Sequence, residues 1–252
     1  MDNTFNFGHF IPISTVDWHG RSASVLFFRG CQFDCPYCQN HAYLTGRDDT
    51  TVEELSSKIS KAVPYISALV FSGGEPTMQP DALADLARYA RSKSLDIGIE
   101  TNGFAFDVIR TMVDEELLDK VFLDIKAPLD EPAHYAKVTG ADEDMGARTV
   151  RAAAGTLTMC LDAEIEVEVR TTVFKGLAGA EQVLNIMSYL DITTSGNLTY
   201  AIQQGIPENT RSLKDAGIFH RDELMKMARA MKPDKIKHIR IRTQEQGDEL
   251  IL

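Results

Sequence analysis

Residues 25–41 read VLFFRGCQFDCPYCQNH, an apolar run followed at once by three of the chain's four cysteines, Cys31, Cys35 and Cys38. The apolar run predicts a buried strand, and the thiols then lie on the loop that leaves it. The C-x3-C-x2-C spacing is short enough for three thiolates to surround one metal centre. The stretch therefore predicts a strand that opens a metal-binding loop.

The same strand signal recurs along the chain and alternates with helical periodicity. Strand-like runs occupy residues 24–28, 66–71, 95–100, 120–125, 163–171 and 197–203, with a last short one at 236–242. Helix-period segments occupy residues 51–63, 81–93, 105–118, 147–161, 180–190 and 221–231. This alternation is typical of an α/β fold with a parallel sheet covered by helices. Six strand–helix units are two short of a closed eight-stranded barrel, so we expect a partial (β/α)6 barrel that is open on one side.

Domain organisation and helix ends can also be predicted. No Pro/Gly/Ser-rich linker interrupts the chain, so we expect a single domain over residues 1–252, with a core at about 20–205 and a C-terminal helix and short strand within 206–252. Thr51 and Glu54 have capping-box spacing, and Asp81 is the expected N-cap of the next helix. Cys160 shares an apolar helical stripe and is expected in the core.

The composition is that of a globular protein, with 44% hydrophobic and 25% charged residues and a net charge of −11. The acidic balance argues against nucleic-acid binding, which needs a basic surface. No apolar run approaches the ~18 residues of a membrane span, and the N-terminus lacks a signal-peptide pattern. We therefore expect a cytoplasmic protein without a membrane partner, where clustered cysteines are more often metal ligands than disulfides.

Two neighbouring strands carry charge on one face. Glu166, Glu168 and Arg170 alternate with apolar residues in one strand, and Phe122, Asp124 and Lys126 share a face in another. A strand that fills a barrel interior is apolar on both faces. The pattern therefore predicts a polar, accessible interior that holds a site, although an Asp124–Lys126 surface ion pair is the simpler alternative.

Spacing alone leaves three interpretations of the cysteine loop open. His41 could complete a Cys3His zinc site. A disulfide with one remaining thiol is possible but fits the expected compartment poorly. A [4Fe–4S] cluster held by Cys31, Cys35 and Cys38 would keep one iron open for a ligand.

The stretch RGCQFDCPYC resembles the radical S-adenosylmethionine superfamily, whose hallmark is C-x3-C-x-aromatic-C, with Tyr37 as the aromatic residue. A second segment, LVFSGGEPTMQP, is similar to the family's Gly-Gly-Glu-Pro loop after the second strand, although two glycines alone are also typical of an ordinary turn. The resemblance implies a [4Fe–4S] cluster whose open iron is chelated by S-adenosylmethionine. It also implies that the methionyl amino group is bound by a loop of Gly73, Gly74, Glu75 and Pro76.

Two further segments, IETNGF and FLDIKAP, resemble those of glycyl-radical-enzyme activating proteins. The resemblance implies that Lys126 meets the methionyl carboxylate and that two acidic residues hold a monovalent cation or polar atoms of the cofactor. Glu100 stands where the family normally has aspartate, and Asp124 is the second acid. Thr101 and Asn102 complete the first segment as cofactor-binding residues.

The segments VEVRTTVFKGL and YAIQQGIPENT add Arg170 and Gln203 to the residues expected at the cofactor. Together, DIKAP, RTTV and QQ look most like proteins that activate anaerobic ribonucleoside-triphosphate reductase, and the resemblance covers residues from about 11 to about 210. There is no second cysteine cluster, so auxiliary iron–sulfur centres are not expected.

The resemblance implies an oxidoreductase that reductively cleaves S-adenosylmethionine to a 5′-deoxyadenosyl radical and forms a glycyl radical on a partner enzyme. The expected partner is the reductase large subunit, with flavodoxin or ferredoxin as electron donor. Alternatives are activation of a pyruvate formate-lyase-type enzyme, action on a small molecule, a non-catalytic zinc-binding module and a simple electron carrier.

Overall fold

The computed structural model describes residues 4–252, which form two compact units built from interleaved segments. The N-terminal unit comprises residues up to 32, 40–101 and 107–121. The C-terminal unit comprises residues 33–39, 102–106 and 122–252. The cysteine loop is divided between them, with Cys31 in the N-terminal unit and Cys35 and Cys38 in the C-terminal unit. A single-domain organisation over residues 1–252 stays a prediction.

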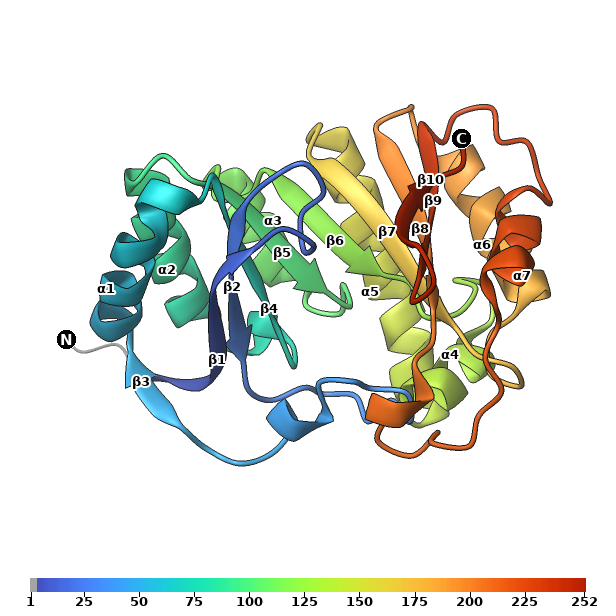
Figure 1. The fold of residues 1–252 in the computed structure, drawn as a ribbon, viewed down its shortest axis with the longest axis horizontal. Coiled ribbons are helices and arrows are strands. Elements are labelled where there is room, and N and C mark those ends of the chain that lie inside the picture. The colour runs from blue at the N-terminus through green and yellow to red at the C-terminus, as the bar shows by residue number, and fades with distance from the viewer. Residues whose placement is uncertain (1–3) are drawn as a thin grey trace. The chain divides into compact units, whose positions relative to one another are not determined.

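The N-terminal unit is a sheet with helices α1 and α2 packed against each other (Figure 1). Its strands are β1 (Thr4–Ser14), β2 (Ala23–Phe28), β3 (Asp49–Thr51), β4 (Ala68–Gly73) and β5 (Asp96–Thr101). Its helices are α1 (Val52–Ala62), α2 (Pro80–Ser92) and α3 (Phe106–Asp114, whose first residue belongs to the other unit), with 3-10 turns η1 (His41–Tyr43), η2 (Val63–Tyr65) and η3 (Pro76–Met78). Strands β2, β4 and β5 run parallel, and β1 pairs antiparallel with both β2 and β3.

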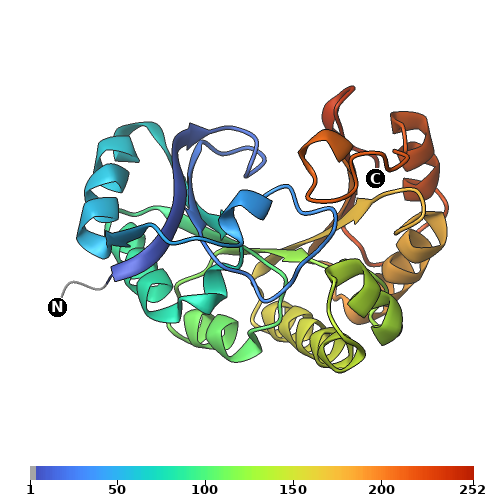
Figure 2. The same cartoon turned by 90° about the horizontal axis from the view of Figure 1, so that it is seen from below.

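The C-terminal unit repeats this plan, and its helices α4 and α5 lie side by side (Figure 2). Its strands are the end of β6 (Lys120–Asp124, whose first two residues belong to the N-terminal unit), β7 (Glu166–Val173), β8 (Leu198–Gln204), β9 (His238–Thr243) and β10 (Gly247–Leu250). Its helices are α4 (Pro132–Thr139), α5 (Glu143–Asp162), α6 (Ala180–Thr193) and α7 (Arg221–Ala228), with the 3-10 turn η4 (Pro207–Asn209). Strands β7, β8 and β9 are parallel and β10 is antiparallel to β9.

Over residues 4–252 the hydrogen-bonded strand order is β5-β4-β2-β1-β3 in the N-terminal unit and β10-β9-β8-β7 in the C-terminal unit. Among these residues the end strands within each unit do not pair with each other, so the sheet is open as predicted. All six main predicted strands are found, as is the short strand near residue 240.

No sequence pattern predicts strands β1, β3 and β10 or helix α4. Strand β1 contains Gly8 and Pro12, which interrupt a strand signal. A Cβ at Gly8 would lie 2.8 Å from the carbonyl oxygen of Phe27, so the irregular position allows close approach of β2. Helix α4 is eight residues long, from Pro132 to a left-handed Gly140 cap, and is too short for a clear period.

One predicted helix cap is confirmed and one is wrong. The Thr51 side chain accepts a hydrogen bond from the Glu54 amide at 3.1 Å, as expected for the N-cap of α1. Asp81 does not cap α2, because the helix begins earlier, at Pro80, with Gln79 as the preceding residue. Proline favours the first helical position because its missing N–H has no partner there in any case.

Helix α5 has 20 residues and buries only one stripe, which includes Val150, Leu157 and Cys160. The prediction that Cys160 lies in the core is confirmed, since its exposed fraction is 0%. Among residues 4–252, no helix combines the length and apolar character needed to cross a membrane.

Burial raises the pKa of the Cys160 thiol from 9.0 to about 12. Because the folded chain holds this proton more tightly than the unfolded chain, the thiol's contribution to stability is complete below pH 9 and declines as the pH rises toward 12. We expect the difference in unfolding free energy between wild type and Cys160→Ala to shrink by about 2 kcal/mol from about pH 8 to about pH 10.5. Urea denaturation at both pH values measures this, and an unchanged difference would contradict it.

Candidate active site

Most of the predicted site residues lie at or just past the ends of strands. In the N-terminal unit these are the ends of β2, β4 and β5, and in the C-terminal unit those of β6 and β8, whereas Arg170 lies within β7. The carboxyl edge of a parallel sheet is where ligands bind in α/β proteins.

In the N-terminal unit the glycine loop is hydrogen-bonded to the chain just before Cys31. The amide of Gly74 donates to the carbonyl oxygen of Phe28 at 2.9 Å, and the amide of Glu75 donates to that of Gly30 at 2.7 Å. A Cβ at Gly74 would lie 2.0 Å from the Gly30 oxygen. The two loops are thus held backbone to backbone, which explains why glycine is needed there.

We expect Gly74→Ala to destabilise the protein by about 3 kcal/mol or to prevent folding, because the backbone of Gly30 cannot yield to the added methyl group. Gly155→Ala is the matched control. Its Cβ would meet Phe106 at 3.5 Å, an ordinary contact, and the change lies within helix α5. The control should be stabilised by up to ~1 kcal/mol. Urea denaturation of the cluster-free proteins measures the change in unfolding free energy for each variant. Equal changes in Gly74→Ala and Gly155→Ala would contradict the packing argument.

Glu75 lies inside the loop rather than on its surface, with 1% of its area exposed. Its Oε1 accepts hydrogen bonds from the Thr77 amide at 3.2 Å, the Thr77 hydroxyl at 2.6 Å and the Thr101 hydroxyl at 2.8 Å. The carboxylate therefore ties β4 to the end of β5. Pro76 is buried as the first residue of η3.

The other residues at the end of β5 are also held by short hydrogen bonds. Glu100 is partly exposed, and its Oε2 accepts from the Ser72 hydroxyl at 2.5 Å. Asn102, which belongs to the C-terminal unit, accepts from the Phe104 amide at 3.0 Å through its side-chain oxygen. The longer side chain at position 100 is thus fixed by the neighbouring strand.

In the C-terminal unit, Cys35 and Cys38 lie in one turn beside an ion pair. The Cys38 amide donates to the Cys35 carbonyl oxygen at 3.1 Å. Lys126, two residues past the end of β6, lies with its Nζ 2.8 Å from Asp124 Oδ2 and 5.7 Å from the Tyr37 ring centroid. The structure brings together two predicted ligands, the predicted aromatic residue and the predicted Asp–Lys pair.

The ion pair sets the charge of this region. Burial alone would lower the pKa of Lys126, but the Asp124 carboxylate and the Tyr37 and Cys35 side chains outweigh it and raise that pKa well above 10.5. Burial raises the pKa of Cys35, and the Lys126 charge opposes this. Lys126 is therefore a fixed ammonium beside the thiol of Cys35.

Arg170 is in a buried ion-pair network, which the sequence analysis did not expect. Its Nε donates to Glu168 Oε1 at 2.8 Å, and its guanidinium lies 4.1 Å from the centroid of Phe122. Arg242 of β9 donates to the same oxygen at 2.7 Å. The predicted polar face is confirmed, but Glu168 and Arg170 are 1% and 7% exposed, so the predicted accessibility is wrong at these two positions.

Arg242 is a residue that the sequence analysis missed, although alternation in HIRIRT already placed it on one face of a predicted strand. Gln203 lies in register with Arg242 and with Thr172, whose hydroxyl is 3.5 Å from the Gln203 side-chain oxygen. Gln203 is partly exposed, whereas the neighbouring Gln204 is buried. Of the two glutamines, Gln203 is the one on the polar face.

The cysteines suit an iron–sulfur cluster by their chemistry. All four are thiols rather than disulfides. Thiolates are the ligands that iron–sulfur clusters take, and Lys126 supplies a positive charge beside Cys35. Cys35 and Cys38 therefore have the ligand type and the neighbouring charge that suit such a cluster.

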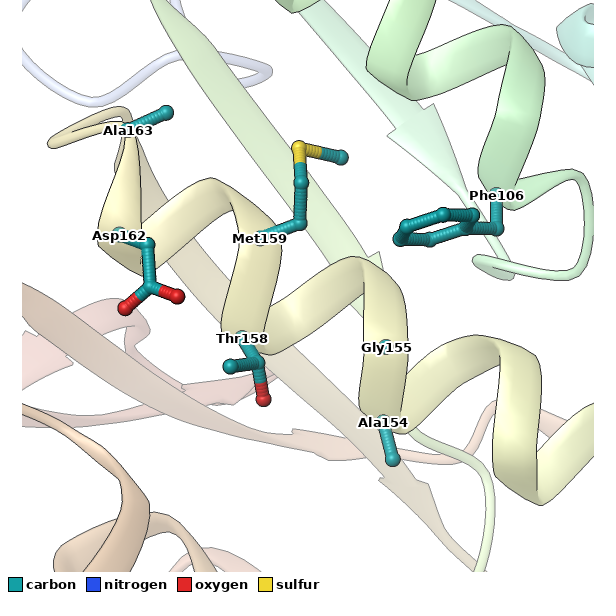
Figure 3. Close-up of a pocket in the computed structure, with 7 residues that line it drawn as sticks. All are labelled: Phe106, Ala154, Gly155, Thr158, Met159, Asp162 and Ala163. Atoms are coloured by element: carbon teal, nitrogen blue, oxygen red, sulfur yellow. The ribbon is translucent and has the colours of Figure 1, made fainter.

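A groove outside the predicted site lies along α5 (Figure 3). Its lining is mostly apolar, and none of the predicted site residues belongs to it. The lining residues are Phe106, Ala154, Gly155, Thr158, Met159, Asp162 and Ala163. One carboxylate and one hydroxyl give it little chemistry, so the cysteine loop remains the candidate active site.

Comparisons with known proteins show the family to which the chain belongs. Residues 25–188 match the family model of the radical SAM superfamily. A putative glycyl-radical enzyme activating enzyme of Methanocaldococcus jannaschii is 32% identical over 79% of this chain and 79% of its own length. The pyruvate formate-lyase-activating enzyme of Clostridium pasteurianum is 33% identical over 46% of this chain and half of its own.

The fold is likewise similar to that of a solved radical SAM enzyme. A radical SAM methyltransferase from Sphaerobacter thermophilus superposes with a TM-score of 0.69 at 13% identity, over 89% of this chain and 67% of its own. The chain therefore belongs to the radical SAM superfamily of enzymes, which use a [4Fe–4S] cluster and S-adenosylmethionine, and within it to the glycyl-radical enzyme activating enzymes.

Proposed function

We propose that this enzyme generates a glycyl radical on the large subunit of an anaerobic ribonucleoside-triphosphate reductase. The observation that carries the proposal is the group formed by Cys35, Cys38, Tyr37 and the Asp124–Lys126 pair at the end of β6. It combines thiol ligands with a buried cation beside them. Such a pairing of soft metal ligands and a fixed ammonium suits a cluster that binds a carboxylate-bearing cofactor.

In this proposal Cys31, Cys35 and Cys38 hold the cluster, and Lys126 binds the carboxylate of S-adenosylmethionine. When bound, the cluster would supply one-electron reductive cleavage of S-adenosylmethionine to methionine and a 5′-deoxyadenosyl radical, which would take a hydrogen atom from a glycine, with the electron coming from the flavodoxin or ferredoxin donor. The protein's part is to orient the cofactor and exclude water. The ammonium of Lys126 is already paired with Asp124, so little reorganisation is needed when a second carboxylate arrives.

Further residues are assigned to the cofactor on the basis of the family resemblance. The loop of Gly73, Gly74, Glu75 and Pro76 binds the methionyl amino group through its backbone, since the Glu75 side chain is engaged with Thr77 and Thr101. The remaining cofactor-binding residues are Tyr37, Glu100, Thr101, Asn102, Asp124, Arg170 and Gln203. The guanidinium of Arg170 is bound to Glu168. Arg170 therefore contributes to cofactor binding indirectly, as part of the polar face of the sheet.

The choice of partner rests on sequence. The segments DIKAP, RTTV and QQ support the reductase, and flavodoxin or ferredoxin is the proposed electron donor. A pyruvate formate-lyase-type enzyme is the second candidate. It is favoured by relatives with that name, which align over about half of this chain.

The test is an anaerobic incubation of the reduced, reconstituted enzyme with S-adenosylmethionine and each candidate partner. We expect 5′-deoxyadenosine by chromatography and a glycyl radical by electron paramagnetic resonance with the reductase subunit. A signal with pyruvate formate-lyase instead would transfer the proposal to the second candidate. Deoxyadenosine without a signal on either partner would indicate a different substrate, such as a small molecule.

A further inference from the structure

The loop that carries Cys35 and Cys38 is contacted by a segment that lies mostly outside the motifs identified in the sequence. Residues 207–217, which we call the strap, follow β8 and begin with η4 (Figure 1). The amide of Ser212 donates to the carbonyl oxygen of Pro36 at 3.0 Å, and its hydroxyl donates to the same oxygen at 3.3 Å. Arg211 donates from Nη1 to the carbonyl oxygen of Asp34 at 3.2 Å and forms an ion pair with the Asp34 carboxylate.

The strap is held at and just past its C-terminal end. Gln204, the last residue of β8, donates from Nε2 to the carbonyl oxygen of Phe219 at 2.9 Å and accepts from the Gln244 amide at 2.7 Å. The Lys175 amide donates to the carbonyl oxygen of Gly217 at 2.9 Å. These bonds fix the C-terminal end of the strap, and its N-terminal end follows shortly after β8, so Arg211 has a defined position from which to hold the loop.

The cysteine loop has a second support at the end of α4. The Asp34 amide donates to the carbonyl oxygen of Thr139 at 2.9 Å. A Cβ at Gly140 would lie 2.5 Å from the Asp34 oxygen, so the loop and the helix end are in close contact. Asp34 is thus held through its amide by α4 and through its carbonyl and carboxylate by Arg211.

We propose that Arg211 is a positioning residue that keeps the Cys35–Cys38 turn in the conformation that receives the cluster. The inference rests on the proposed function in one respect, that these two cysteines are cluster ligands. The Arg211 and Asp34 side chains are 43% and 55% exposed, so their pairing adds little to global stability. Its effect falls on local opening of the loop, and groups that orient metal ligands in this way control metal retention.

The first test uses the cluster-free protein. In Arg211→Ala we expect amide hydrogen exchange in residues 33–39 to accelerate about five- to tenfold, with the cooperative urea transition nearly unchanged. In Arg211→Lys, which keeps the positive charge but lacks the planar guanidinium, exchange in residues 33–39 should be faster than in wild type and slower than in Arg211→Ala. Arg88→Ala is the control, because Arg88 is a similarly exposed ion-paired arginine on α2. It should leave exchange in residues 33–39 unchanged.

The second test uses the reconstituted enzyme. We expect Arg211→Ala to lose iron to a chelator about tenfold faster than wild type, to show an altered electron paramagnetic resonance spectrum of the reduced cluster, and to be partly rescued by lysine. Asp34→Asn removes the same ion pair with little change in volume and replaces Arg211→Ala if that variant fails to fold.

Exchange and iron loss equal to wild type in Arg211→Ala, or in Asp34→Asn if that variant takes its place, would overturn the assignment. If the wild type itself holds no cluster, the proposed function fails, and the exchange measurement alone decides whether Arg211 positions the loop.

Discussion

Replacing Cys35 with alanine is expected to give a folded protein that retains no [4Fe–4S] cluster and forms no 5′-deoxyadenosine. Cys35 is buried beside Lys126, and no other thiol is available in the C-terminal unit except Cys38 and the core residue Cys160. Mutating a residue that only hydrogen-bonds to a metal ligand lowers metal affinity ~10–100-fold. Removing the ligand itself should therefore lower the affinity for the cluster more than about 100-fold. Iron and sulfide content and the yield of 5′-deoxyadenosine measure the effect.

Cys160→Ala is the matched control for this experiment. It removes a thiol from the core of α5, where the cost is a cavity of about 1–2 kcal/mol, and should leave iron content and cofactor cleavage unchanged. Wild-type levels of iron and sulfide in the Cys35 variant would show that the cluster is held elsewhere. Zinc in place of iron in the wild type would support the non-catalytic zinc module instead.

The second large effect is expected at Lys126. In Lys126→Met we expect the dissociation constant of S-adenosylmethionine to rise about 30–100-fold, because truncating one partner of a buried charge pair costs about 2–3 kcal/mol. The Lys126 side chain is 12% exposed, and removing its ammonium leaves Asp124 without its cation just where the cofactor carboxylate should bind. Equilibrium dialysis with the reconstituted enzyme measures the change.

Lys137→Met, on the exposed face of α4, is the control and should bind the cofactor as wild type does. Because the pKa of Lys126 is raised well above 10.5, its charge is present at all pH values below that. This group should therefore add no pH dependence to cofactor binding in the neutral range. Unchanged affinity in Lys126→Met would remove the lysine from the cofactor site.

The part of the candidate site that is formed by residues close together in the chain could be predicted from the sequence. The thiols of Cys35 and Cys38 were identified from spacing, and the Asp124–Lys126 pair from alternation in a predicted strand and from the family resemblance. The structure places these groups together in one unit. The prediction for Arg170 was only partly correct. Alternation showed that Arg170 and Glu168 share a face, but not that both are buried or that Arg242 from another strand pairs with Glu168.

Functional contacts between distant segments were beyond the sequence analysis. Glu75 was expected at the cofactor, but its carboxylate binds Thr101, 26 residues away. Arg211 carried no signal at all, because its partner Asp34 lies 177 residues earlier in the chain. A hydrogen bond of this kind leaves no periodicity or spacing for a sequence pattern to detect.

By itself the sequence determined the order and type of the main elements, the open parallel architecture and the cysteine loop. These follow from apolar periodicity and short-range spacing, which are local properties of the chain. The tertiary structure alone decided which polar groups are paired and buried, as for Glu75 with Thr101, Glu168 with Arg170, and Asp34 with Arg211. Such pairing depends on which strands and loops become neighbours when each unit packs, and burial then makes an unpaired polar group costly.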